Sequence, residues 1–231
     1  MISPAPPPPQ SLLQPRKLGP LIPNEHGAWG MLTTAFLLGW WATPPFSWRP
    51  LYLVPAVVGI FLMRYPVGLY FKKRRVTRAM QISLTREKRW FWIYLVFTVL
   101  VALPLFWKLA WWWLWLFVGP SGLIFFLHLQ SIQRRQEKSL TAEVTAMLGL
   151  ALLVPAASYA GLLYLRWDLL SLMGLFVFYY LWRIITIRSI VKDPSRPRTD
   201  IKKMGKRELL YSAFFLLIVV GGAHLFYFIN P

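Results

Sequence analysis

The chain has 231 residues, of which 57% are hydrophobic and 17% aromatic, and it carries a formal net charge of +18 at pH 7. This hydrophobic fraction excludes an ordinary soluble domain. The basic charge does not indicate a nucleic-acid partner, because it falls in short clusters that separate apolar runs. Without cysteine, the chain cannot form disulfides, thiolate metal sites or thiol nucleophiles.

Residues 1–22 form a proline-rich segment that contains Pro4, Pro6 to Pro9, Pro15 and Pro20. Proline at this density favours an extended, solvated chain, and the segment lacks the apolar stretch of a cleavable signal peptide. We expect a disordered cytoplasmic tail over residues 1–22, followed by a single transmembrane helical domain over residues 23–231.

Seven apolar runs follow, each near the length of about twenty residues that crosses a bilayer as a helix. They predict helices at residues 24–43, 51–71, 90–107, 111–130, 140–165, 169–187 and 209–229. Proline predicts a broken helix in three of these runs, because it removes a backbone N–H donor and clashes with the preceding turn. The three positions are Pro66, Pro120 and Pro155.

Basic residues alternate between rich and poor connections. Residues 72–89 and 188–207 contain eight Lys or Arg each, residues 134–138 contain three, and Arg16 and Lys17 precede the first helix. The other connections contain one each: Arg49, Lys108 and Arg166. By the positive-inside rule, the N-terminus and the rich connections are cytoplasmic, and the C-terminus lies outside. The sequence thus predicts an all-α polytopic helical bundle of seven transmembrane helices in the plasma membrane.

Tryptophan marks the predicted outer ends independently. The indole ring prefers the headgroup interface of a bilayer. The residues at these ends are Trp40, Trp41, Trp48, Trp107, Trp111, Trp112, Trp113 and Trp167. We therefore expect an aromatic belt at the outer face and anionic lipid headgroups as partners of the basic cytoplasmic face.

Weak internal similarity suggests a degenerate parallel repeat of four helices followed by three. Glu25 and Glu143 begin the first and fifth helices, and Leu-Met-Arg at 62–64 corresponds to Leu-Trp-Arg at 181–183. Parallel repeats of this kind occur in membrane transporters. Matches this short also arise by chance in leucine-rich helices, so both interpretations stay open.

Charged residues within apolar helices are the main functional candidates, since exposing a charge to lipid is costly. Arg64, Arg183 and Glu143 all lie toward the predicted inner ends of their helices. We expect them to face a shared basic cavity that opens to the cytoplasm. The structural alternatives are a snorkelling arginine and a glutamate that complements the helix dipole.

The string from Pro23 to Gly30 is the most distinctive in the chain and adds three candidates, Glu25, His26 and Trp29. A histidine at this depth can carry a proton or bind a ligand, or it can hydrogen-bond at a helix interface. The predicted ligand-binding set is Glu25, His26, Trp29, Arg64, Glu143 and Arg183. No metal site or cofactor is expected, because His128 and His224 fall at opposite ends of different helices.

The Pro-x-Glu-His-Gly-Ala-Trp string, the basic connection after the second helix, and Ser139 to Glu143 before a proline-containing helix resemble the YwiC-like family of small bacterial membrane proteins. This resemblance implies a multi-helix membrane fold and location. The family has no established biochemical activity that the resemblance could imply here.

The layout is also similar to that of UbiA-type intramembrane prenyltransferases, which hold Mg²⁺ and a prenyl diphosphate through paired Asp-rich motifs. This sequence departs from their pattern. Residues 72–89 contain no Asp, and Asp193 and Asp200 do not have the required spacing. Mg²⁺ needs several oxygen ligands in near-octahedral arrangement, so the standard chemistry of these enzymes is not predicted.

Three function classes stay open. The interrupted helices and inner-side charges favour a transporter-like or ligand-binding protein for a small anionic or lipid-like ligand. The alternatives are a divergent UbiA-like lipid-modifying enzyme and an accessory or assembly subunit that packs on a membrane-protein partner.

Overall fold

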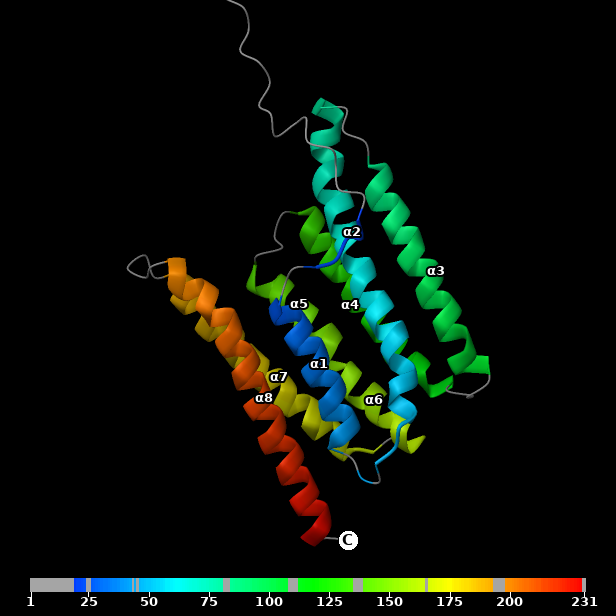
Figure 1. The fold of residues 1–231 in the computed structure, drawn as a ribbon, viewed down its shortest axis with the longest axis vertical. Helices are drawn as coiled ribbons and strands as arrows, with labels where there is room; N and C mark the ends of the chain where they lie inside the picture. Colours follow the sequence, from blue (N-terminus) through cyan, green and yellow to red (C-terminus); the bar gives the residue numbers. More distant parts are fainter. Residues whose placement is uncertain are drawn as a thin grey trace, which may run out of the picture.

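The computed structural model describes residues 19–23, 26–42, 44, 46–80, 84–107, 112–134, 139–164, 166–192 and 198–229. All regular structure in these ranges is helical (Figure 1), which confirms the predicted all-α class. The elements are α1 (His26–Trp41), η2 (Arg49–Leu53), α2 (Val54–Met80), α3 (Thr85–Trp107), η3 (Trp112–Leu114), α4 (Trp115–Gln133), α5 (Leu140–Ala151), α6 (Leu153–Leu162), α7 (Asp168–Lys192) and α8 (Arg198–Ile229).

Seven helical segments form the bundle, with α5 and α6 counted as one. Six segments are long and apolar enough to cross a membrane: Arg49–Phe71, Thr85–Trp107, Trp115–Gln133, Leu140–Leu162, Asp168–Ile190 and Arg207–Ile229. The seventh, α1, has 16 residues, or roughly 24 Å of helix. These lengths identify the chain as an integral membrane protein.

The connections lie at two opposite ends of the bundle. The last turns of α2, α4 and α7 and the first turns of α3, α5 and α8 lie toward one end, and the last turn of α8 lies at the other (Figure 1). We call the first the basic end, because Lys73, Arg86, Arg188 and Arg207 lie there. We call the second the tryptophan end, where the exposed indoles are Trp41, Trp48, Trp107, Trp113, Trp115 and Trp167.

One residue of the predicted aromatic belt, Trp40, does not face lipid. Trp40 is buried and donates its indole N–H to the carbonyl oxygen of Ser47, at 2.5 Å. Its ring packs against Phe46 and Trp48. This indole therefore fastens the α1–η2 connection instead of facing lipid. Trp111 lies outside the described residues, as does the side chain of Trp112.

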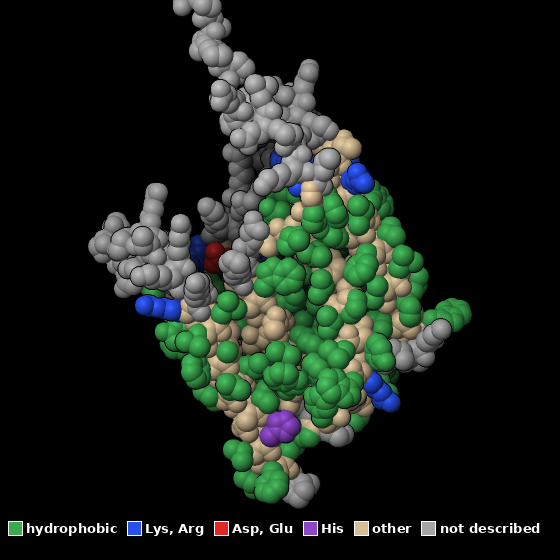
Figure 2. Space-filling model, in the orientation of Figure 1, with side chains coloured by type: hydrophobic (Ala, Val, Ile, Leu, Met, Phe, Trp, Pro, Cys, Tyr) green, Lys and Arg blue, Asp and Glu red, His purple; other side chains and the backbone are tan. Residues whose placement is uncertain are grey.

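The centre of the bundle is α1, which packs against α5, α6, α7 and α8. Ala35 and Leu38 are fully buried. At Gly39 the backbones of α1 and α6 touch, because an added Cβ would overlap the carbonyl group of Val154. Small residues allow this approach in membrane helices. Hydrophobic side chains cover most of the surface visible in Figure 2, as a lipid-facing bundle requires.

The helix over residues 140–162 is broken at Leu152, three residues before Pro155. Pro155 has no N–H to donate to the carbonyl of Ala151, so a continuous helix would leave that carbonyl unpaired. Restarting at Leu153 puts Pro155 in the first turn of α6, where backbone N–H groups have no helical partner anyway. Leu163, in the left-handed conformation with φ 64°, then ends α6.

The other two predicted breaks were wrong. α2 runs continuously through Pro66 and α4 through Pro120. In a bilayer, losing one hydrogen bond costs less than ending a helix and exposing several backbone groups to lipid. Thus proline alone did not predict the break, and the position of α6 against α1 distinguishes the broken segment from the other two.

Four helices extend further than the apolar runs predict. α2 continues to Met80 and α3 begins at Thr85, whereas the sequence predicted a connection over residues 72–89. Likewise, α7 continues to Lys192 and α8 begins at Arg198. Lys and Arg are good helix formers, and residues 72–80 contain neither Gly nor Pro, so the helix continues beyond its apolar part.

Candidate functional site

The main polar contact inside the bundle joins α7 to α8 near the basic end. Arg183 Nε donates to Glu208 Oε2 at 3.0 Å, and Arg183 Nη2 contacts Glu208 Oε1. The arrangement is bidentate, which is the strongest geometry for a guanidinium and a carboxylate. The two side chains are only 15% and 17% exposed. The guanidinium also lies over the ring of Tyr211, at 4.7 Å from its centre.

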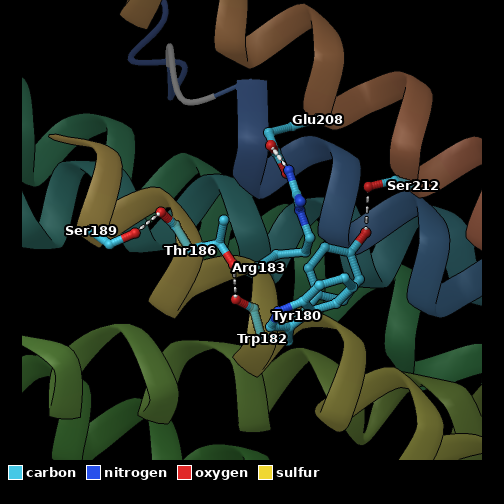
Figure 3. Close-up of polar contacts among 7 residues, drawn as sticks. All are labelled: Tyr180, Trp182, Arg183, Thr186, Ser189, Glu208 and Ser212. Carbon is cyan, nitrogen blue, oxygen red and sulfur yellow. Dashed lines mark hydrogen bonds and ion pairs between the residues drawn. The ribbon is translucent and has the colours of Figure 1, made fainter. Parts of the chain in front are cut away.

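Figure 3 shows Arg183 and Tyr180 pointing the same way from α7, toward α8. They are three residues apart, so they share one face of the helix. Two neighbouring hydroxyl groups of α7 donate to carbonyls of α7 itself, Thr186 to Trp182 at 2.9 Å and Ser189 to Thr186 at 2.7 Å. These hydroxyls therefore do not compete for the Arg183 guanidinium.

A second polar contact lies one helical turn deeper. The Tyr180 hydroxyl donates to Ser212 Oγ at 3.0 Å, and a hydrogen bond with the Thr34 side chain links it to α1. All three side chains are buried. Polar groups of α1, α7 and α8 thus extend from the basic end toward the middle of the membrane.

Tyr179 lies beside this contact, with its ring stacked on Phe215 at 4.1 Å and an interplanar angle of 9°. Its hydroxyl oxygen is buried and lies beside the Ser212 side chain, whose own hydroxyl accepts from Tyr180. The hydroxyl lies close enough to Arg183 and Glu208 to interact electrostatically with both. A tyrosine hydroxyl oxygen can accept a hydrogen bond, so it can pair with a neighbouring group that becomes protonated.

A more exposed ion pair joins α7 to α5. Arg188 Nη1 lies 3.3 Å from Glu143 Oε2. Ser139 caps α5 by accepting a hydrogen bond from the N–H of Ala142, which places Glu143 in the first helical turn. α7 therefore supplies one arginine to α8 and another to α5.

The third ion pair at the basic end joins α2 to α3. Lys73 Nζ contacts Glu87 Oε1, and the Glu87 side chain is only 2% exposed. Beside it, Arg86 Nη2 donates to the carbonyl of Gly19 at 2.9 Å, and the Tyr94 hydroxyl donates to that of Leu21 at 3.3 Å. Residues 19–23 thus run along α3 before they reach α1.

The tryptophan end contains a matching arginine–carboxylate pair. Arg166 binds Asp168 through two hydrogen bonds of 3.0 and 2.8 Å, and its guanidinium donates to the Tyr227 hydroxyl at 2.6 Å. Burial lowers the pKa of Arg166, but the hydrogen bond to Asp168 and the nearby charges outweigh burial, so this pKa lies above its usual value. The contact fastens the start of α7 to the end of α8.

The structure places the predicted site residues in different surroundings. Trp29 donates its indole N–H to the carbonyl of Pro23 at 3.2 Å and packs edge-on against Phe61. Arg64 is half-buried in the middle of α2. Glu25 and the side chain of His26 lie outside the described residues.

The predicted charge pairing differs from the observed one for two of these residues. The sequence placed Glu143 and Arg183 around a shared centre, where each could neutralise the other charges. In the structure Arg183 pairs with Glu208, and Glu143 pairs with Arg188. Glu208 was missed because the apolar run predicted a helix start at residue 209. A single carboxylate next to an apolar run in an otherwise basic segment was the signal that could have found it.

Histidine and acidic residues do not suggest a metal site in the described parts of the chain. These parts contain no group of three or more His, Cys, Asp or Glu that could hold an ion. His128 Nδ1 lies 3.2 Å from the carbonyl oxygen of Ala142, and His224 Nε2 lies 2.7 Å from that of Trp41. Both imidazoles therefore contact the backbone of a neighbouring helix.

A family model described as "YwiC-like protein" matches residues 22–159. The chain is also similar to the "Uncharacterized protein YwiC" of Bacillus subtilis (strain 168), with 32% identity over 139 residues. That match covers 55% of this chain and 49% of the relative, so the chain spans about half the length of the curated relative it matches. No solved structure matches the chain. The family model ends within α6, before Arg183, Arg188 and Glu208.

Proposed function

The chain belongs to the YwiC-like family, and from that premise we propose that it is a transporter-like or ligand-binding protein of the plasma membrane. Its basic end faces the cytoplasm, with the N-terminus inside and the C-terminus outside. The ligand is a small anion or a lipid with an anionic headgroup, and the shared chemistry is a carboxylate, sulfate or phosphate group that a guanidinium binds through two hydrogen bonds.

The observation that carries this proposal is the ion pair between Arg183 and Glu208. Both groups are largely buried between two membrane helices. Desolvating two charges costs free energy that their attraction does not necessarily recover, so such a pair is weak evidence for stability alone. Ionisable groups within membrane segments commonly mark a ligand or ion pathway. In this proposal Glu208 occupies the position that the anionic group of the ligand takes when it binds.

Two further features support the same end of the bundle. Lys and Arg concentrate there, and cytoplasmic connections are enriched in these residues. The α5–α6 segment is discontinuous, as helices that line transport sites commonly are, and its first half, α5, carries Glu143 at the basic end. The candidates Glu25, His26, Trp29, Arg64 and Glu143 remain in the proposed set, with Arg183 as the residue that contacts the ligand.

The test is thermal unfolding of the purified, full-length protein in detergent with four probes: sulfate, succinate, phosphatidylglycerol and phosphatidylcholine. A ligand that binds the folded state raises its unfolding temperature with concentration. We expect an increase with at least one anionic probe and none with zwitterionic phosphatidylcholine. A response to sulfate or succinate identifies a free anion, and a response to phosphatidylglycerol alone identifies a lipid headgroup.

The matched variants are Arg183→Gln and Arg166→Gln. Each removes an arginine that binds a carboxylate bidentately at the α7–α8 interface, but at opposite ends of the bundle. We expect Arg183→Gln to abolish the stabilisation by the anionic probe and Arg166→Gln to retain it. No stabilisation by any anionic probe, or equal loss in both variants, would overturn the proposal.

A further inference from the structure

Glu208 is a largely buried carboxylate, 17% exposed, and it is paired with one cation among the described residues. Its hydrogen bonds and ion pair in the described parts of the chain are with Arg183 alone. It lies at the start of the Arg207–Ile229 span, one helical turn before Ser212, whose hydroxyl is already engaged by Tyr180. Any group that binds the Arg183 guanidinium in place of Glu208 therefore leaves this carboxylate without its cation.

The titratable and charged groups around Glu208 come from two helices. α7 contributes Arg183, Tyr179 and Tyr180, and α8 contributes Tyr211 and the exposed Arg207. α1 approaches α8 where Gly30 faces Leu209, and Thr34, the α1 side chain that is hydrogen-bonded to Tyr180, does not titrate. The Glu143–Arg188 contact links α7 to α5 instead. Among the side chains that the structure describes, none of these groups is a second cation that is both buried and paired with Glu208.

We propose that binding of an anionic group at Arg183 is coupled to the uptake of one proton by Glu208. This inference rests on the proposed function. It adds that the protein takes up its ligand together with one proton, so that a monoanionic ligand binds with no net change in charge at the site.

The steps balance in charge and in atoms. Before binding, Arg183 and Glu208 sum to zero. The anionic group then forms the hydrogen bonds with the guanidinium that Glu208 made, and the displaced carboxylate is left buried and unpaired. A buried ion without a partner is unfavourable, and the group neutralises instead. One proton from water at the basic end adds to a carboxylate oxygen, which leaves a cation, the charge of the ligand and a neutral acid. The sum is zero for a monoanionic group such as the phosphodiester of phosphatidylglycerol and −1 for sulfate, which carries two negative charges.

The side chains around Glu208 can accommodate its neutral, protonated form. A protonated carboxyl has one O–H donor, and the buried hydroxyl oxygen of Tyr179 can accept a hydrogen bond. The position of Glu208 in the first turn of the span keeps it near water at the basic end. Because the carboxyl group stays near water, it can release this proton again when the ligand leaves and Arg183 becomes available to it.

The experiment measures two quantities for the full-length protein in detergent: the Kd of a probe and the number of protons taken up for each probe bound. Sulfate and phosphatidylglycerol are the probes, because their charges stay constant between about pH 6 and pH 9. If one proton accompanies each ligand, the Kd rises about tenfold for each pH unit over the range in which free Glu208 is ionised and bound Glu208 is protonated. A pH-indicator dye in weakly buffered solution should report uptake of about one proton per probe bound.

The deciding variant is Glu208→Gln, which imitates the neutral acid. It should bind the probe with a Kd independent of pH, more tightly than the unmodified protein at high pH, and without proton uptake. Asp168→Asn is the control, since it neutralises the carboxylate of the corresponding pair at the tryptophan end. It should keep both the pH dependence and the proton uptake.

The outcomes separate the two proposals. If neither probe binds at any pH, the proposed function fails. If a probe binds with a pH-independent Kd, or if Glu208→Gln keeps the pH dependence, anion binding stands and the coupling to Glu208 is contradicted.

Discussion

Two described residues of α8 hold the Arg183 side chain, Glu208 through an ion pair and Tyr211 through its ring. Both contacts are short-range, so together they fix the guanidinium to within one helical turn of the basic end. An arginine free to snorkel would extend toward the headgroups instead. The observed pairing therefore differs from the snorkelling alternative, and a ligand-binding role for Arg183 stays a proposal.

This pairing predicts a strong coupling between the two residues. Arg183→Leu or Glu208→Leu alone leaves one buried charge unpaired and should lower the free energy of unfolding by roughly 3 kcal/mol, whereas the double variant should recover much of that loss. Chemical or thermal unfolding in detergent measures the cycle. The control pairs Arg183→Leu with Asp168→Leu at the other end, where the effects should add. Additivity within about 0.5 kcal/mol for Arg183 and Glu208 would show that the pair is not coupled.

The sequence could identify Arg183 and Glu143 as candidates but not their partners. A charge within an apolar run is visible in the sequence, and so is its approximate depth. The choice of partner depends on how α5, α7 and α8 rotate about their own axes, which is decided by packing. Glu208 lies next to an apolar run and not within it, so hydropathy assigned it to a connection.

At the scale of the elements, the contact of α1 with α6 decides where the bundle is tightest. Gly39 lies against the backbone of Val154, and the neighbouring Leu38 and Ala157 are fully buried. The break at Leu152 gives α6 its own direction, and that direction allows the close approach. A broken segment with a well-packed second half fits a rigid structural core beside the polar contacts of α7 and α8.

Gly39→Ala should therefore be destabilising. Its Cβ would overlap backbone atoms of Val154, which cannot move aside as a flexible side chain would. Overpacking of this kind costs about 1–3 kcal/mol, and we expect a lower unfolding temperature in detergent. Gly119→Ala in α4 is the control, because an added Cβ there meets nothing within 4 Å. It should leave stability unchanged or raise it slightly through helix propensity. Equal unfolding temperatures for both variants would contradict the close approach of α1 and α6.

Most elements could be predicted from the sequence, because apolar length and the charge of the connections determine which segments cross a bilayer. The ends of α2, α3, α7 and α8 could not, since a helix in water continues as far as its local sequence permits. Proline gave three candidate breaks and the structure has one of them, at residues 151–153. Packing against α1, which hydropathy does not encode, distinguishes that segment.

The whole molecule is polarised between its two ends. Among the described residues, three ion pairs lie at the basic end, on Lys73, Arg183 and Arg188. The tryptophan end carries exposed indoles, with Trp167 86% exposed. This polarity is what the positive-inside rule and the aromatic belt anticipate. The parallel repeat of four and three helices and the disordered tail over residues 1–22 stay predictions.

Orientation in the membrane is the claim on which the proposed function depends, because an anion site at the basic end is cytoplasmic only if that end faces inward. The chain contains no cysteine, so single cysteines can be introduced without background. Ser83→Cys and Ser195→Cys lie in the α2–α3 and α7–α8 connections, and Ser47→Cys lies in the α1–η2 connection. In intact cells, a membrane-impermeant thiol reagent should label Ser47→Cys and leave the other two unlabelled until the membrane is opened. Labelling of Ser83→Cys and Ser195→Cys in intact cells, with Ser47→Cys protected, would contradict the account.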